Sequence, residues 1–122
     1  MKINKNINIL KAEKKEEKLI YGIVYEPNVP DLQGDFINEI EIEKMAHNYL
    51  MNSQEIGLQH QMDISNGVKI VESYIASQDL EINKNKIIKG TWIIACKVLD
   101  ENIWNLIKEN KLTGFSFSGT AE

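Results

Sequence analysis

The chain has 122 residues, a net charge of −4 and 43% apolar residues, which suits one globular domain over 1–122 with a single hydrophobic core. All 14 basic residues are lysines. An acidic chain without arginine is poorly suited to phosphate recognition, so we expect no nucleic-acid partner. There is no bilayer-spanning apolar run, no secretory signal and only one cysteine, Cys96, so we expect a cytoplasmic protein without membrane contact or disulfide.

The N-terminal part of the chain shows three elements in order. Residues 1–17 form a polar stretch that we interpret as an arm or an edge strand. Residues 18–25 have the composition of a strand. Asn38 and Glu41 have the spacing of a capping box, and apolar residues then recur every three or four positions, which predicts an amphipathic helix over 39–52.

The middle of the chain is rich in strand patterns. A short strand is expected at 56–60, followed by two long strands at 67–77 and 87–98, with a hairpin turn at 83–85 between them. One parity of the second long strand is apolar and is expected to face the core: Ile88, Trp92, Ile94, Cys96 and Val98. Cys96 is therefore interpreted as a small buried hydrophobe and not as a nucleophile.

The C-terminal part predicts one more helix and one more strand. Asp100 is a good N-cap for a helix with Ile103, Trp104 and Ile107 on its apolar face, and 112–119 reads as a strand. Strands outnumber helices, and neighbouring strands look hairpin-linked. We therefore predict an α+β fold with a mixed, mainly antiparallel sheet, or a partly closed β-barrel, flanked by two helices.

Two histidines and two serines are the first candidates for chemistry. His47 lies off the apolar stripe of its helix, so we expect it to face solvent without a catalytic role. His60 shares the parity of apolar neighbours, and is either a hydrogen-bonded core histidine or a general base. Ser116 and Ser118 share one face of the last strand, which is either an edge strand showing serines to water or room for a substrate backbone. A serine nucleophile needs a base, for which His60 is the only good candidate.

A carboxylate and a possible metal site complete the search. Glu72 has the parity of Val68 and Ile70, so it either interrupts an inward face, where it could orient His60, or reaches the surface through a bulge. No pair of possible metal ligands has an established spacing, so we expect no metal; the residues considered are His60, Asp63, Asp31 and Asp35. No nucleotide motif is present, and we expect no cofactor.

Four segments, taken together and in order, carry a family resemblance. They are Ile20-Tyr-Gly-Ile-Val-Tyr-Glu-Pro-Asn-Val-Pro-Asp-Leu-Gln-Gly-Asp35, Ile70-Val-Glu-Ser-Tyr-Ile-Ala76, Gly90-Thr-Trp92 and Leu112-Thr-Gly-Phe-Ser116. The chain resembles the XkdF-type phage serine proteases over about residues 18–119. That family is similar to the tailed-phage prohead proteases and, more distantly, to herpesvirus assemblin.

The resemblance implies a site and a biological role. Ser116 is expected to be the nucleophile and His60 its base, with Glu72 as a candidate third member. The residues expected beside the substrate are Gly114, Phe115, Phe117 and Ser118. The implied fold is a partly closed barrel, and the implied activity is limited proteolysis of phage scaffold or capsid polypeptides inside a prohead that assembles in the bacterial cytoplasm. A homo-oligomer is compatible with this role.

The chain departs from the wider group in two respects. Related enzymes draw a third catalytic residue from beyond the serine strand, whereas six residues follow Ser116 here, and assemblin-like enzymes use an arginine near the oxyanion, which this chain lacks. Backbone N–H groups would have to serve as oxyanion donors. We therefore expect a chain that folds but turns over poorly. The alternative is a non-catalytic capsid-assembly module with the same fold and a peptide-binding groove.

Overall fold

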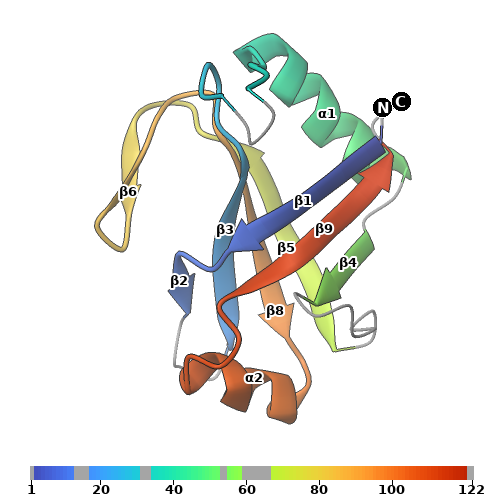
Figure 1. Cartoon of the computed structure of the whole chain (residues 1–122), viewed down its shortest axis with the longest axis vertical. Helices are drawn as coiled ribbons and strands as arrows, with labels where there is room; N and C mark the ends of the chain where they lie inside the picture. Colours follow the sequence, from blue (N-terminus) through green and yellow to red (C-terminus); the bar gives the residue numbers. More distant parts are fainter. Residues whose placement is uncertain (1, 13–16, 31–33, 53–54, 59–66, 121–122) are drawn as a thin grey trace.

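A computed structural model describes residues 2–12, 17–30, 34–52, 55–58 and 67–120 of the chain (Figure 1). Its elements, in chain order, are β1 (Lys2–Asn8), β2 (Lys11–Ala12), β3 (Leu19–Tyr25), α1 (Glu39–Asn52), β4 (Glu55–Leu58), β5 (Val68–Ile75), β6 (Leu80–Ile82), β7 (Asn85–Ile87), β8 (Trp92–Val98), α2 (Glu101–Lys108) and β9 (Gly114–Thr120). Every strand pair among the described residues is antiparallel. The predicted α+β class with two helices and mainly antiparallel pairing is confirmed.

The strands form two main sheets and a small hairpin. One sheet has the order β1-β9-β4, the other has the order β2-β3-β8-β5, and β6 pairs only with β7. The chain passes from the first sheet to the second between β1 and β2. The predicted edge strand in 1–17 is therefore two edge strands: β1 at the edge of the first sheet and β2 at the edge of the second. No pairing among the described ranges joins the sheets into a closed barrel, and the partly closed barrel stays a prediction.

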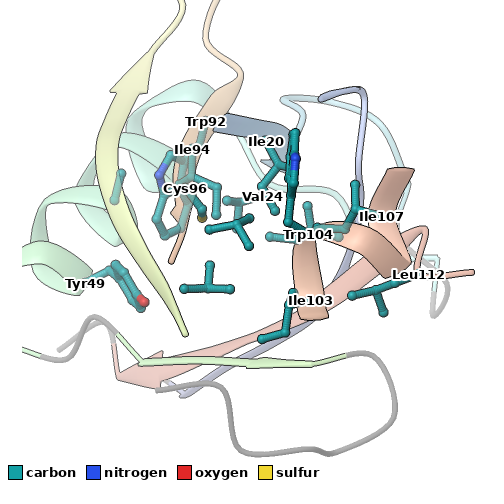
Figure 2. Packing of buried hydrophobic residues seen from close by; sticks show 14 of the residues in the cluster. Ile20, Val24, Tyr49, Trp92, Ile94, Cys96, Ile103, Trp104, Ile107 and Leu112 are labelled. Carbon is teal, nitrogen blue, oxygen red and sulfur yellow. The ribbon is translucent and has the colours of Figure 1, made fainter. Parts of the chain in front are cut away.

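The hydrophobic core lies where the two sheets and both helices meet. Ile7 of β1 packs with side chains of β3, β8 and the helices in one buried cluster, and Figure 2 shows this convergence around Trp92 and Trp104. The helices sit at opposite ends of the sheets (Figure 1). Because all of these apolar faces lie on one cluster, the sheets and helices stabilise one another. None of the described helices is long and apolar enough to cross a membrane.

Strand β8 is buried on both faces. Trp92, Ile94, Cys96 and Val98 lie in the main core as predicted. Ile93 has the opposite parity and belongs to a second buried cluster with Ala76 and Ile87. The prediction for Ile88 is wrong, because the alternation was extended beyond the strand: Ile88 lies in the turn before β8 and is 39% exposed.

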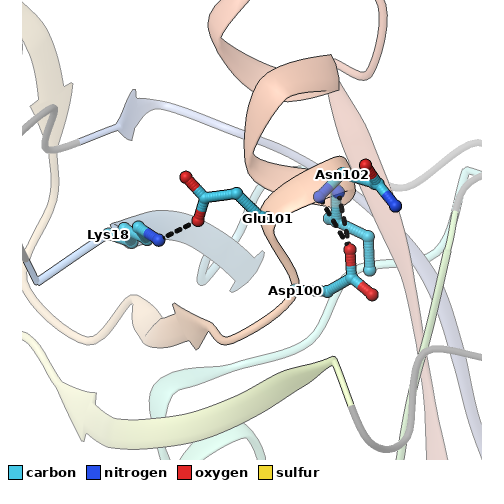
Figure 3. Close-up of polar contacts among 5 residues, drawn as sticks. Lys18, Asp100, Glu101 and Asn102 are labelled. Atoms are coloured by element: carbon cyan, nitrogen blue, oxygen red, sulfur yellow. Dashed lines mark hydrogen bonds and ion pairs between the residues drawn. The ribbon is translucent and has the colours of Figure 1, made fainter.

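Both helices begin at the predicted caps. Asn38 Oδ1 accepts a hydrogen bond from Glu41 N at 2.9 Å, and Asn38 Nδ2 donates to Glu41 Oε1 at 3.0 Å. Asp100 Oδ1 accepts from the main-chain N–H groups of the second and third residues that follow it, at 2.8 and 3.1 Å (Figure 3). These bonds satisfy N–H groups that have no partner inside a helix, which is why the helices begin at these residues.

The predicted hairpin turn is present but closes a smaller unit than expected. Asn83 and Lys84 have φ values of 47° and 68°, the left-handed conformation typical of a tight two-residue turn. This turn joins β6 to β7, whereas β5 and β8 pair with each other over their own length. The β6–β7 hairpin is thus an excursion within the longer β5–β8 pair, and its apolar residues cover Ile93.

Candidate active site

Ser116 lies on β9, the central strand of the three-stranded sheet. In the register Ser116 is opposite Asn6 of β1 on one side and Gly57 of β4 on the other. The edge-strand alternative for the last strand is therefore wrong. Two earlier strands, β1 and β4, pair with it, one on each side.

The register separates the residues of β9 into two rows. Residues directly opposite each other in an antiparallel ladder share a face of the sheet. Phe115 is opposite Ile7, which is 1% exposed and packed in the core, whereas Ser116 is opposite Asn6, which is exposed. Ser116 thus occupies the row of the outer face. The side chains of 115–120, and with them those of Phe117 and Ser118, fall outside the described part of the structure.

Gly114 is buried at the start of β9. A Cβ atom at this position would lie 2.6 Å from the carbonyl oxygen of Ile7. The absence of a side chain therefore permits the close approach of β1 and β9, which is a packing role. The predicted contact of Gly114 with substrate stays a prediction.

His60 lies outside the described residues, as do Asp31 and Asp63. The described chain reaches Leu58 at the end of β4, and Leu58 is opposite Phe115, the residue before Ser116. Two peptide units separate Leu58 from His60, which span at most about 7 Å. The position of His60 relative to Ser116 stays a prediction.

Glu72 faces away from the main core. The β5–β8 register shifts between Ile70 and Glu72, so strand alternation changes there. Ser73, next along the chain, accepts a hydrogen bond from the core residue Trp92, from Nε1 to Oγ at 2.9 Å, and Glu72 itself is exposed. The inward-face alternative for Glu72 is wrong, and the bulge alternative describes its position.

A tyrosine accompanies Glu72 on this outer face. Burial, then the Glu72 carboxylate, then Tyr21 raise the pKa of the Tyr74 hydroxyl. A negative charge near the phenol disfavours its ionisation and so raises its pKa. The direction of the shift is therefore the one expected if the side chains of Glu72 and Tyr74 are neighbours. A catalytic role for Glu72 stays a prediction, and it requires the His60 segment to reach this outer face of β5.

Two other predicted assignments can be checked directly. Cys96 is fully buried, and this burial raises the pKa of its thiol from 9.0 to about 12. Because the thiolate is the reactive form, Cys96 is no nucleophile near neutral pH. His47 is exposed on α1 as predicted, with its Nε2 4.0 Å from Glu43 Oε1.

The described residues contain no group of three or more histidine, cysteine, aspartate or glutamate side chains placed to hold a metal ion. Of the four ligands considered, Asp35 alone is described, and it is exposed. The expectation of no metal therefore stays a prediction.

Asn6 and Gly57, the residues opposite Ser116, were missed from the sequence. The signal was present in Ile3-Asn-Lys-Asn-Ile-Asn8, where asparagine alternates with apolar or basic residues at the period of a strand. Reading the first 17 residues as an arm or edge strand did not reveal that this strand lies beside Ser116.

Comparison with known proteins gives one family and two relatives. The family model described as "Putative phage serine protease XkdF" matches residues 6–122. The "Phage-like element PBSX protein XkdF" of Bacillus subtilis (strain 168) is 46% identical over 112 residues, which cover 92% of this chain and 40% of that protein. "Uncharacterized protein YqbD" of the same strain is 46% identical over 119 residues, 97% of this chain and 36% of that protein. The chain thus spans less than half the length of these curated relatives. No solved structure matches it.

Proposed function

Because the chain belongs to the family described as "Putative phage serine protease XkdF", we propose that it is a serine endopeptidase domain with Ser116 as nucleophile and His60 as base. Its substrates are scaffold or capsid polypeptides of a phage, cut inside the assembling prohead in the bacterial cytoplasm. The observation that carries the proposal is the place of Ser116: it lies in the outer row of a central strand, next to the strand that leads to His60.

The proposed reaction is acyl transfer to water. His60 takes the proton of the Ser116 hydroxyl as the oxygen attacks a peptide carbonyl carbon, and then delivers this proton to the leaving amine. A water molecule attacks the acyl-enzyme, with His60 again as base, and releases the new carboxyl group and free Ser116. No metal or cofactor takes part in these steps.

The register places a condition on His60. Gly57 is in the row of Ser116, whereas Leu58 is in the row of Phe115. A regular strand would give His60 the parity of Leu58, on the face opposite to Ser116. The proposal therefore requires strand alternation to break between Leu58 and His60.

The register also limits the oxyanion donors. Ile9 N donates to Thr113 O at 2.9 Å, and hydrogen-bonded pairs alternate with non-hydrogen-bonded pairs along an antiparallel ladder. Continuing this alternation along β9 turns the main-chain N–H of Ser116 towards Gly57. This N–H is engaged in the ladder, so the oxyanion donors come from main chain outside β9 in the proposed mechanism.

A fluorophosphonate probe tests the proposal because it reacts with activated serines. The folded chain should be labelled at Ser116, as located by peptide mass spectrometry, and Ser116→Ala should remove the label. Ser118→Ala is the matched control on the same strand and should label normally. His60→Ala should slow labelling by about 10²–10⁴, the usual contribution of a general base.

The opposite results have a definite meaning. No labelling of the natively folded chain, or labelling that survives Ser116→Ala, would contradict the enzyme. Absence of labelling together with binding of scaffold or capsid polypeptide would favour the non-catalytic assembly module. The lack of arginine in this chain, and the register that sets Ser116 opposite Gly57, support this second function.

A further inference from the structure

A hollow of about 260 Å³ opens between β1 and β3. Figure 1 shows β1 crossing β3 obliquely. The strands approach most closely at Gly22, where a Cβ atom would lie 3.1 Å from the carbonyl oxygen of Asn8. Asn6, Asn8, Ile23 and Glu26 line the hollow beyond this crossing.

The β1 side of the hollow presents main-chain groups of Asn8. The pair Ile9 and Thr113 is hydrogen-bonded, so the next pair in the ladder, Asn8 and Gly114, is a non-hydrogen-bonded one. The N–H and C=O of Asn8 therefore point away from β9 and towards β3. Outside the strand ladders, neither group makes a backbone–backbone hydrogen bond to another described residue.

The β3 side presents matching groups of Ile23. Val98 N donates to Lys18 O at 3.0 Å, so even-numbered residues of β3 bond to β8, and odd-numbered residues face the other edge. On that edge Tyr21 O accepts from Leu10 N at 2.8 Å, and β2 pairs with β3 no further than Tyr21. The N–H and C=O of Ile23 come next on this edge, and no described strand pairs with them.

We infer that this hollow is a docking groove for an extended peptide segment. Two strand edges with main-chain donors and acceptors border it, which is the arrangement that accepts an added strand. Leu10, Ile23 and Val29 offer apolar contacts, and Glu26 is the only charged residue among the described residues of the lining. A basic residue next to β-branched residues in the peptide matches this lining.

The loop over the groove is held in place before a peptide arrives. Asn28, which has a φ of 60°, donates its N–H to Ile37 O at 2.9 Å. This bond ties 26–30 to the segment before α1. A held loop loses less conformational freedom on binding than a free one, which favours affinity.

The groove lies one strand away from the proposed nucleophile, since Asn6 both lines the groove and is opposite Ser116. A strand added at the outer edge of β1 would lie about 10 Å from β9, two strand spacings, too far for its own peptide bonds to be cut there. The natural occupant is therefore a part of the substrate polypeptide remote from the cleaved bond. This identification rests on the proposed function, whereas binding to the groove does not.

The test is an NMR titration of the full 122-residue chain carrying Ser116→Ala, so that turnover plays no part. The probe is the acetylated and amidated pentapeptide Thr-Val-Lys-Val-Thr. We expect saturable shifts of the Asn8 and Ile23 amide signals, with a Kd below about 1 mM. The same peptide with N-methyl groups on both valines should bind at least about tenfold more weakly, because it lacks two main-chain donors.

Two protein variants distinguish binding in the groove from non-specific binding of the peptide. Val29→Arg fills the groove and should abolish the shifts, whereas Val71→Arg, at a comparably exposed residue of β5, should leave them unchanged. Absence of saturable shifts at Asn8 and Ile23 up to about 5 mM peptide would overturn the groove. So would equal binding of the N-methylated peptide, or binding that survives Val29→Arg. None of these results depends on whether Ser116 reacts with a fluorophosphonate.

Discussion

The two sheets differ in how their faces are covered. In the four-stranded sheet, β8 has six of its seven residues buried, because both of its faces lie under other parts of the chain. In the three-stranded sheet, Ile7 of β1 is buried while its neighbours Asn6 and Asn8 are exposed, so along the described part of β1 one face packs on the core and the other is exposed. The difference explains why Cys96, on β8, is fully buried while Asn6, the residue opposite Ser116, is exposed.

The largest expected effect comes from breaking the doubly covered strand. Trp92 is fully buried, lies 5.8 Å from Tyr49 between ring centroids and donates to Ser73. Trp92→Ala should lower the free energy of unfolding by about 3–5 kcal/mol in urea titrations. Ser116→Ala, in the open row, should change it by less than about 0.5 kcal/mol. Equal losses would show that the two sheets are not covered as described.

A second prediction concerns the place where the sheets touch. A Cβ atom at Gly22 would overlap the side chain of Ile7. Gly22→Ala should therefore cost about 1–3 kcal/mol of unfolding free energy, as overpacking does. In a double-mutant cycle, Ile7→Ala should remove much of this penalty, since the overlapping atoms are gone. Simple additivity of the two losses would contradict the contact.

The third prediction follows from the buried thiol of Cys96. Its pKa rises from 9.0 to about 12 on folding, so the unfolded chain loses this proton at lower pH than the folded chain. The protonated thiol therefore makes its full contribution to the free energy of unfolding below pH 9.0, and this contribution falls as the pH rises towards 12. By pH ~10.5 the wild type should lose about 2 kcal/mol more than Cys96→Ala, measured as the difference between their unfolding curves at each pH. Parallel curves would mean that Cys96 reaches solvent.

A smaller effect is expected at the helix that begins beside the end of β8. Asp100→Ala removes the cap of α2 and should cost about 1 kcal/mol. Glu101→Gln breaks only the ion pair with Lys18, whose side chains are 63% and 28% exposed, and should cost less than about 0.5 kcal/mol (Figure 3). Thermal or urea unfolding of both variants measures these two losses of unfolding free energy. A larger loss for Glu101→Gln than for Asp100→Ala would contradict the prediction.

The smallest effect is expected at Glu72. Its carboxylate faces the outer side of β5, away from the core that separates the two sheets. Glu72→Gln should therefore change fluorophosphonate labelling of Ser116, and cleavage of a scaffold polypeptide, by less than about twofold. A drop of orders of magnitude with an unchanged fold would restore Glu72 as the residue that orients His60.

Local patterns in the sequence were sufficient to predict individual helices, their caps and the core-facing residues of a strand. The caps at Asn38 and Asp100, the helix over 39–52 and the core parity of β8 from Trp92 onward are all properties of neighbouring residues, and all are confirmed. The same reasoning failed at Ile88, where an apolar residue continues the alternation of β8 back into the turn before that strand begins. An exposed isoleucine in a turn carries no local signal that distinguishes it from a core residue.

Features that depend on pairing could not be predicted in this way. The bulge that turns Glu72 outward exists because β5 and β8 shift register, which is a property of two strands and not of one. The central position of β9 likewise depends on β1, from the other end of the chain. The candidate nucleophile could be named from the sequence, whereas its neighbours Asn6 and Gly57 could not.

The pairing of β1 with β9 has a consequence for how the chain acquires its structure. Lys2 is opposite Thr120, so forming this ladder closes a loop of nearly the whole chain, with a length-dependent entropy cost of about 4 kcal/mol. The β5–β8 pair closes much shorter loops and can form earlier. During synthesis on the ribosome, β1 emerges before β9 and has no partner on that side until β9 has emerged. Pulse-labelled hydrogen exchange should therefore find β8 protected before β9. The sheet that bears Ser116 is therefore completed after the β5–β8 pair has formed.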